Sequence, residues 1–185
     1  KRKENDVRLF CSSVTLNQDR PCMEYIDGEE GIKKAYQRIL DAESDEILIL
    51  LPMTHKEEDD SLRSFRKTYT QKRRQKNVHC RVLAHDTPLG LRYQSRDVFE
   101  QRKTVLVPEN LYPFHREQVI AGETYTSFDH ETNQACMMYF PSFSASQRAI
   151  FESIWNQYTQ ETSIGYSTIS LEHIPIAILE SYALC

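Results

Sequence analysis

His115 is the residue of this chain whose surroundings come closest to a pattern for phosphodiester chemistry. That chemistry uses a histidine nucleophile, a lysine two residues on that holds the phosphate, and an aspartate seven residues on that orients a histidine. Here Glu117 stands at the lysine position and Gly122 at the aspartate position. A carboxylate at position 117 would repel a phosphate. We therefore predict that the chain is not an enzyme and has no catalytic residue.

A second polar set, Arg96, Glu100 and Arg102, lies just before this position. In a helix, Arg96 and Glu100 are one turn apart and can pair, whereas Arg102 faces elsewhere unless the helix has ended. Together with Tyr93 and His115, these residues could line a cleft that recognises a small anionic or hydroxylated ligand through forked hydrogen bonds. The alternative is a structural ion-pair cluster that joins this segment to the sheet, and the sequence leaves both open.

The pattern of possible metal ligands predicts neither a metal site nor a cofactor. The chain has five cysteines, an odd number, and none are close in sequence, which argues against a disulfide framework and a C-x-x-C zinc site. The acidic run Glu57–Asp60 lacks the spacing and the glycine of a calcium loop. This use of cysteine is typical of a reducing cytosol, so we expect a cytoplasmic location.

Length and charge exclude several classes of protein. With 185 residues, 27% of them charged, the chain fits one soluble globular domain with a real core. A net charge of -4 argues against a generic nucleic-acid binder. No apolar run approaches the roughly 18 residues that span a bilayer, so we expect no membrane partner.

Hydrophobic periodicity predicts alternating strands and helices in the first half of the chain. We expect strands at 7–15, 22–26, 46–51 and 78–84, and helices at about 29–43 and 61–76. The continuous apolar run at 46–51 indicates a strand covered on both faces. Two successive strand–helix passages indicate crossover units, and so a partly parallel sheet. After Thr87–Pro88 we expect a charged helix that continues through Arg102.

The second half reads as short strands followed by a helix. Strands are expected at 104–107, 118–121, 124–128 and 135–140, with a hairpin turn at Gly122–Glu123. A helix at about 144–160, capped by Ser142 or Ser144, should anchor Phe151 and Trp155 in the core. The predicted fold is α/β, a mixed, partly parallel β-sheet flanked by helices.

Several segments follow one another in an order that resembles a known family. They are Tyr25–Lys33, Glu46–Leu51, Cys80–Leu83, Arg96–Arg102 and Phe151–Trp155. This order resembles the regulatory domain of TrmB-type transcriptional regulators, a phospholipase-D-like module without catalytic residues. The resemblance covers about residues 22–160 and implies a phospholipase-D-like fold. It makes 1–21 an N-terminal segment that continues from a removed or absent DNA-binding domain, and 161–185 a C-terminal tail or arm.

The function that this resemblance implies is effector sensing, dimerisation, or both, in a TrmB-like regulator. It implies a small-molecule effector and a homodimer, with DNA bound only through a helix-turn-helix domain that this chain does not contain. Two alternatives stay open. One is a phospholipase-D-like phosphodiesterase or nuclease that uses a degenerate or unpredicted site. The other is a pure oligomerisation module that uses the last helix or the isoleucine-rich tail beyond Gln160.

Overall fold

The computed structural model describes residues 21–42, 44–52 and 60–165. In chain order its elements are β1 (Cys22–Asp27), α2 (Glu29–Asp41), β2 (Glu46–Leu51), α3 (Asp60–Gln75), β3 (His79–His85), α4 (Pro88–Gln94), α5 (Asp97–Glu100), β4 (Lys103–Val107), β5 (Glu117–Ala121), β6 (Thr124–Asp129), β7 (Gln134–Tyr139) and α6 (Pro141–Gly165). The predicted strand at 7–15, the acidic residues 57–59 and the tail from 166 lie outside the described residues.

The seven strands form one mixed sheet in the order β1-β7-β6-β5-β2-β3-β4. β2, β3 and β4 run parallel to one another, whereas every other neighbouring pair is antiparallel. The parallel part follows from the crossovers through α3 and through α4–α5, as a parallel pair requires. The predicted α/β class with a mixed, partly parallel sheet flanked by helices is therefore confirmed.

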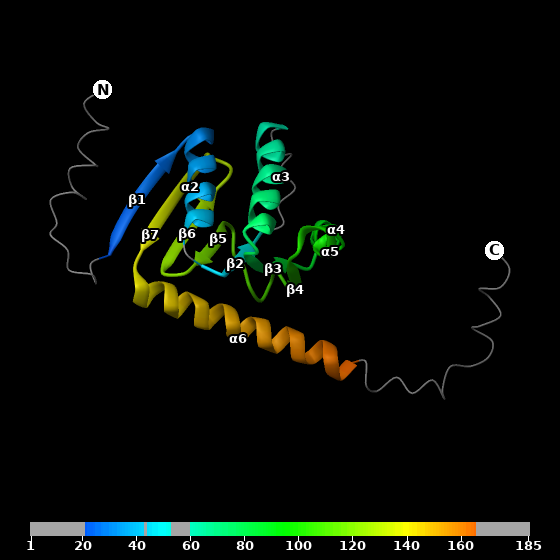
Figure 1. The fold of residues 1–185 in the computed structure, drawn as a ribbon. Coiled ribbons are helices and arrows are strands. Elements are labelled where there is room, and N and C mark those ends of the chain that lie inside the picture. The colour runs from blue at the N-terminus through cyan, green and yellow to red at the C-terminus, as the bar shows by residue number, and fades with distance from the viewer. Residues whose placement is uncertain (1–20, 43, 53–59, 166–185) are drawn as a thin grey trace, which may run out of the picture.

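Helices cover both faces of the sheet (Figure 1). α2 and α3 lie on one face, where Ile32, Tyr36 and Ile39 pack against alternate residues of the strands. The long α6 crosses the other face, where Phe151 and Trp155 pack against Leu48 and Leu83. Neighbouring residues of β2 thus belong to different cores, which confirms that this strand is covered on both sides.

Two predicted helices have different bounds in the structure. The helix expected to continue through Arg102 is broken into α4 and α5, because the Ser95 hydroxyl donates to the Arg92 carbonyl and competes with the helical backbone. The last helix begins at Pro141 rather than Ser144, since proline suits a first helical turn. Ser144 is buried and donates to the Glu123 carbonyl at 2.8 Å, so it anchors the helix on the β5–β6 turn instead of capping it.

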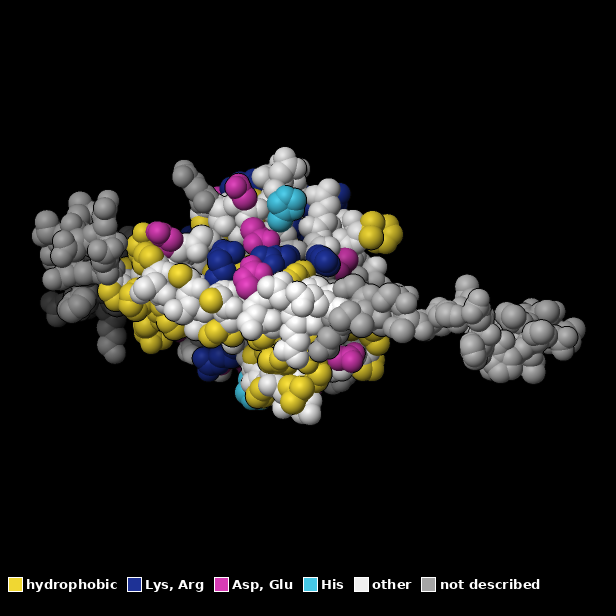
Figure 2. Space-filling model, turned by 90° about the horizontal axis from the view of Figure 1, so that it is seen from below, with side chains coloured by type: hydrophobic (Ala, Val, Ile, Leu, Met, Phe, Trp, Pro, Cys, Tyr) yellow, Lys and Arg dark blue, Asp and Glu magenta, His cyan; other side chains and the backbone are white. Residues whose placement is uncertain are grey.

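A charged clamp fixes α6 to the sheet. The Arg81 guanidinium, from β3, binds the Glu46 carboxylate of β2 at 2.7 and 2.8 Å and the Glu152 carboxylate of α6 at 2.8 and 2.5 Å. It also lies 5.1 Å from the centre of the Trp155 ring. In Figure 2, seen from the α6 side, basic and acidic side chains gather at the middle of this face. Such bidentate pairs position α6 as well as stabilise it.

Gly90 allows α4 to lie directly on the end of β3. A Cβ atom at this position would lie 2.1 Å from the His85 carbonyl oxygen, which is backbone and cannot turn aside. We expect Gly90→Ala to lower the free energy of unfolding by about 1–3 kcal/mol, as overpacking does. Urea denaturation would measure the loss, and Leu91→Ala, at an exposed position of the same helix, should change little. Equal stability of the two variants would contradict this packing.

No helix within the described ranges is long and apolar enough to cross a membrane.

Candidate functional site

The structure brings four of the five predicted ligand-binding residues together. Arg96 precedes α5, and its Nη2 lies 2.9 Å from the Glu100 carboxylate, so the predicted one-turn pair is confirmed. α5 ends at Glu100, and Gln101 adopts a left-handed conformation with φ 49°. The chain therefore turns back, and Arg102 joins the pair from the other side.

Arg102 points into the protein rather than toward a ligand. Its side chain is only 4% exposed and lies between the Asp97 carboxylate, at 2.8 Å, and the Glu100 carboxylate. It donates a further bond of 2.5 Å to the Tyr93 carbonyl and covers the Tyr93 ring at 3.4 Å from its centre. The fork of the guanidinium is therefore occupied by partners within the same segment.

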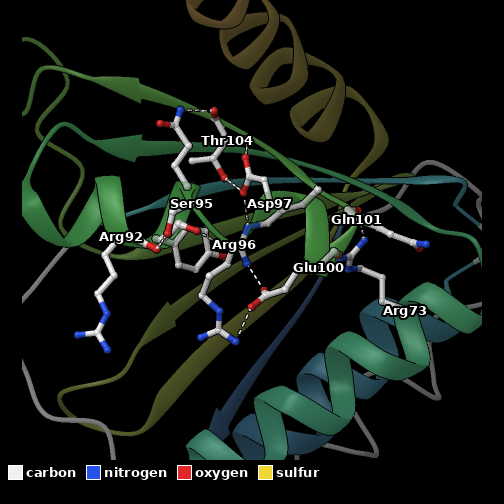
Figure 3. Close-up of polar contacts among 11 residues, drawn as sticks. Arg73, Arg92, Ser95, Arg96, Asp97, Glu100, Gln101 and Thr104 are labelled. Carbon is white, nitrogen blue, oxygen red and sulfur yellow. Dashed lines mark hydrogen bonds and ion pairs between the residues drawn. The ribbon is translucent and has the colours of Figure 1, made fainter. Parts of the chain in front are cut away.

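The same cluster closes the outer edge of β4 (Figure 3). The Thr104 backbone N–H donates to the Asp97 carboxylate at 2.6 Å, and the Gln94 side-chain amide donates to the Thr104 carbonyl at 2.9 Å. From α3, the buried Arg73 donates to the carbonyls of Glu100 and, at 3.0 Å, Gln101. The two bonds to the Thr104 backbone satisfy it at the edge of the sheet, where an unpaired strand would otherwise offer it to another chain. These contacts match the alternative in which the cluster joins this segment to the sheet.

His115 lies apart from this cluster. It is exposed, in the segment between β4 and β5. Among the residues that the structure describes, no hydrogen bond, ion pair or ring contact links it to Tyr93, Arg96, Glu100 or Arg102. Direct contacts therefore join four of the five predicted residues, and His115 is not among them.

A different polar cluster, which the sequence did not predict, is centred on Glu117. This side chain is only 4% exposed, and two hydrogen-bond donors and one guanidinium group from other parts of the chain approach its Oε2 atom. The Tyr36 hydroxyl of α2 donates at 2.7 Å, and Nε2 of His130, just after β6, lies at 2.7 Å. Nη2 of Arg66, from α3, lies 3.8 Å away. We call Tyr36, Arg66, Glu117 and His130 the Glu117 cluster.

Aromatic stacking orients the Glu117 cluster. The rings of Tyr36 and Phe128 stack at 4.3 Å, and the His130 ring is nearly parallel to Phe128 at 5.8 Å. Because a carboxylate oxygen only accepts, Nε2 of His130 carries the proton in its contact with Glu117. The second imidazole nitrogen, Nδ1, is buried. The imidazole therefore directs Nε2 at Glu117 and keeps Nδ1 away from solvent.

The electrostatics of the cluster keep Glu117 ionised. Burial on its own raises the pKa of the Glu117 carboxyl, but the bond from His130, the charge of Arg66 and the bond from Tyr36 together hold that pKa below its ordinary value. Burial and then the Glu117 charge raise the pKa of Tyr36 well above its ordinary value, so Tyr36 stays a donor. A buried carboxylate that is paired in this way is a fixed point of negative charge.

The cluster lies where the parallel strands end. Gln118 of β5 pairs with Leu50 of β2, so Glu117 is beside the last residue of β2. In open α/β sheets, ligands bind outside the carboxyl ends of the strands, where the direction of the strand order changes. Here the strand order reverses at β2, because β3 and β4 follow on one side of it and β5 lies on the other. This position at the end of the parallel strands makes the Glu117 cluster a second candidate for a recognition site.

The sequence contained a signal for this cluster. Glu117 opens one strand and His130 follows the next, so an antiparallel hairpin must bring the two together. Tyr36 lies among the buried residues of α2, and a tyrosine at an apolar position of a helix gives no separate indication of a polar contact. No group of three or more possible metal ligands exists within the described part of the chain.

No protein-family model and no curated protein matches this chain. Among solved structures, one similar chain is that of TrmBL2, an archaeal chromatin protein whose structure shows a novel mode of DNA binding. The two chains are 13% identical, with a TM-score of 0.49 over 82% of this chain and 56% of TrmBL2. This chain thus spans about half the length of that protein. At this identity and TM-score, the likeness transfers neither a family nor a function to this chain.

Proposed function

We propose that this chain is a non-catalytic, effector-sensing domain of a TrmB-like transcriptional regulator, and that the Glu117 cluster is its recognition site. The observation that carries the proposal is the buried Glu117 carboxylate, held by two hydrogen bonds and one ion pair at the position where a phosphodiesterase would have its lysine. The order of sequence segments that resembles TrmB-type regulators supports the choice of family.

The chemistry of the cluster favours recognition over catalysis. A phosphodiesterase needs an accessible imidazole nitrogen and a cation that attracts phosphate. Nε2 of His130 is directed at Glu117 and Nδ1 is buried, while Glu117 repels phosphate. Such a fixed carboxylate instead suits a ligand with donors, such as hydroxyl or amine groups.

The Glu117 cluster could transmit ligand binding because its four side chains come from different parts of the fold. Tyr36 and Arg66 belong to α2 and α3, whereas Glu117 and His130 belong to the sheet and its loops. A ligand that replaces one donor would change how these helices are tied to the sheet. If its affinity for two such arrangements differs, it would shift an attached DNA-binding domain between them.

A thermal-shift screen with a panel of sugars, polyols and amines tests this site. We expect at least one compound to stabilise the wild-type chain and to lose most of that effect with Glu117→Gln. The matched control is Arg96→Ala, which alters the first predicted site and should keep the response. A response lost in Arg96→Ala and kept in Glu117→Gln, or no response to the whole panel, would refute the assignment.

Hydrolysis of a bis-aryl phosphate tests the non-catalytic part of the proposal. We expect no turnover above the buffer rate with the wild-type chain. Turnover that disappears with His130→Ala but persists with His115→Ala would instead establish a phosphodiesterase at an unpredicted site.

A further inference from the structure

α3 is a basic helix without the acidic residues that would balance its charge. No aspartate or glutamate occurs between Asp60, its first residue, and Asp86. In the neighbouring α2, by contrast, Lys33 lies 2.6 Å from Glu29 and 2.9 Å from Glu30. Like charges that lack such pairs destabilise a helix. The stability of α3 on its own therefore does not account for its charges.

Three basic side chains of α3 and of the turn that follows it have partners within the fold. Nη2 of Arg66 lies 3.8 Å from the Glu117 carboxylate, and the buried Arg73 donates to backbone carbonyls. Nζ of Lys76 lies 2.9 Å from the Asp41 carboxylate of α2. These cations hold the helix to the rest of the chain and are therefore not available to a ligand.

Three exposed cations of α3 remain. Lys67 and Arg74 have no hydrogen bond or ion pair among the residues that the structure describes, and Nζ of Lys72 donates to the neutral Gln37 side chain at 3.1 Å. The helix dipole favours cations in the last turn, which contains Lys72 and Arg74, but this effect does not extend to Lys67. We call Lys67, Lys72 and Arg74 the α3 ridge. Its positive charge remains after every paired or buried cation is excluded.

The side chains beside the α3 ridge are polar and uncharged. The exposed positions between and after the cations are Thr68, Gln71 and Gln75, whereas Phe65 and Tyr69 turn inward and pack against the core. A protein-binding hot spot or a helix on a membrane surface needs apolar anchors, and this face has none. Lysine, arginine, threonine and glutamine are instead the side chains that contact the phosphates and sugars of nucleic acids.

We propose that the α3 ridge binds the sugar–phosphate backbone of a nucleic-acid duplex without reading its bases. Lys67 and Arg74 are about 10 Å apart along the helix axis. That span covers about three successive phosphates of one strand, which follow one another every 3.4 Å along a duplex. A single strand would instead need exposed aromatic rings on which its bases could stack.

The position of α3 allows such a contact. α3 lies beside α2 on the face of the sheet opposite α6 (Figure 1). The net charge of -4 argues against binding over the whole surface, but it does not prevent binding at one basic face. The α3 ridge excludes Arg66 and the other members of the Glu117 cluster, so this proposal and the proposed function can fail separately.

Fluorescence anisotropy with a labelled DNA duplex, and with an RNA duplex of the same sequence, tests the α3 ridge. In about 50 mM salt we expect the full chain to bind at least one of them with a Kd of about 10⁻⁶–10⁻⁴ M, the range of sequence-independent binding. Lys67→Gln/Arg74→Gln should bind at least about tenfold more weakly, and the slope of log K against log salt should become smaller by about two. Arg92→Gln/Arg116→Gln removes as many exposed cations elsewhere and should bind as the wild type does.

Thermal melting of both double variants shows that the fold is retained, as expected for exposed positions. Binding of neither duplex by the wild type, or equal losses in the two variants, would overturn the proposal. So would a polyglutamate peptide that binds through Lys67 and Arg74 as tightly as a duplex, since the partner would then be an acidic protein. Sedimentation with phosphatidylserine vesicles that depends on the same two residues would overturn it in favour of a membrane surface.

Discussion

Replacing Arg102 with methionine should lower the free energy of unfolding by about 3–5 kcal/mol, as for the loss of one member of a buried ion-pair network. The change leaves the Asp97 and Glu100 carboxylates, each 17% exposed, without the guanidinium between them. It also removes the cation over the Tyr93 ring. Urea denaturation monitored by circular dichroism measures the difference.

Arg96→Met is the matched control for Arg102→Met. Both arginines contact Glu100, but the Arg96 side chain is largely exposed and its pair is screened by water. We expect Arg96→Met to lower the free energy of unfolding by less than about 1 kcal/mol, which is the usual contribution of an exposed ion pair. If Arg102→Met were as stable as Arg96→Met, the structural role of the cluster would be wrong, and its assignment as a ligand site would become the better one.

Glu117→Gln should lower the free energy of unfolding at pH 7 by about 1.5–3 kcal/mol, the contribution of a hydrogen bond to a charged group. The amide keeps the shape of the side chain but withdraws the negative charge that Arg66 and His130 face. It also turns part of an acceptor into a donor against the Tyr36 hydroxyl. Thermal or urea denaturation of both proteins at matched pH checks this loss.

The pH dependence of that loss has a definite sign. The folded-state pKa of Glu117 lies below its ordinary value, so its carboxylate stabilises the fold fully above the unfolded-state pKa of about 4.3. This contribution is lost as the pH falls through the folded-state pKa, because the folded protein must then bind a proton that the unfolded chain has already bound. The difference in the free energy of unfolding between the wild type and Glu117→Gln should therefore become smaller below about pH 4.

An exposed carboxylate provides the control for the pH experiment. Glu109→Gln also removes one carboxylate but lies on the surface of the segment between β4 and β5. At pH 7, the Glu109→Gln variant should have the same free energy of unfolding as the wild type. If the free energies of unfolding of the wild type and Glu117→Gln differed by the same amount from pH 7 to pH 3, the Glu117 charge would not stabilise the fold.

The bounds of the strands followed from local sequence, whereas the helix break did not. The apolar run of β2, the alternation in β3 and the turn at Gly122 were sufficient to place these elements within about one residue of the structure. The break between α4 and α5 follows from the bond of the Ser95 hydroxyl, and the end of α5 is held by Arg73, which is 27 residues from Glu100 in sequence. Periodicity contains no information on such side-chain bonds. The phospholipase-D-like assignment and the domain bounds at 21 and 160 stay predictions.

By itself, the sequence determined a mixed α/β sheet with helices on both faces, because apolar periodicity is a local property that each segment expresses alone. It also determined that the lysine and aspartate of a phosphodiesterase motif are replaced by Glu117 and Gly122. Only the tertiary structure decided which polar groups meet. It directed Arg102 inward against its own segment, and it joined Tyr36 to His130 across 94 positions. The hairpin register indicated only that Glu117 and His130 are near each other. The burial of these groups and their contacts with α2 and α3 arise from packing between elements that are remote in sequence.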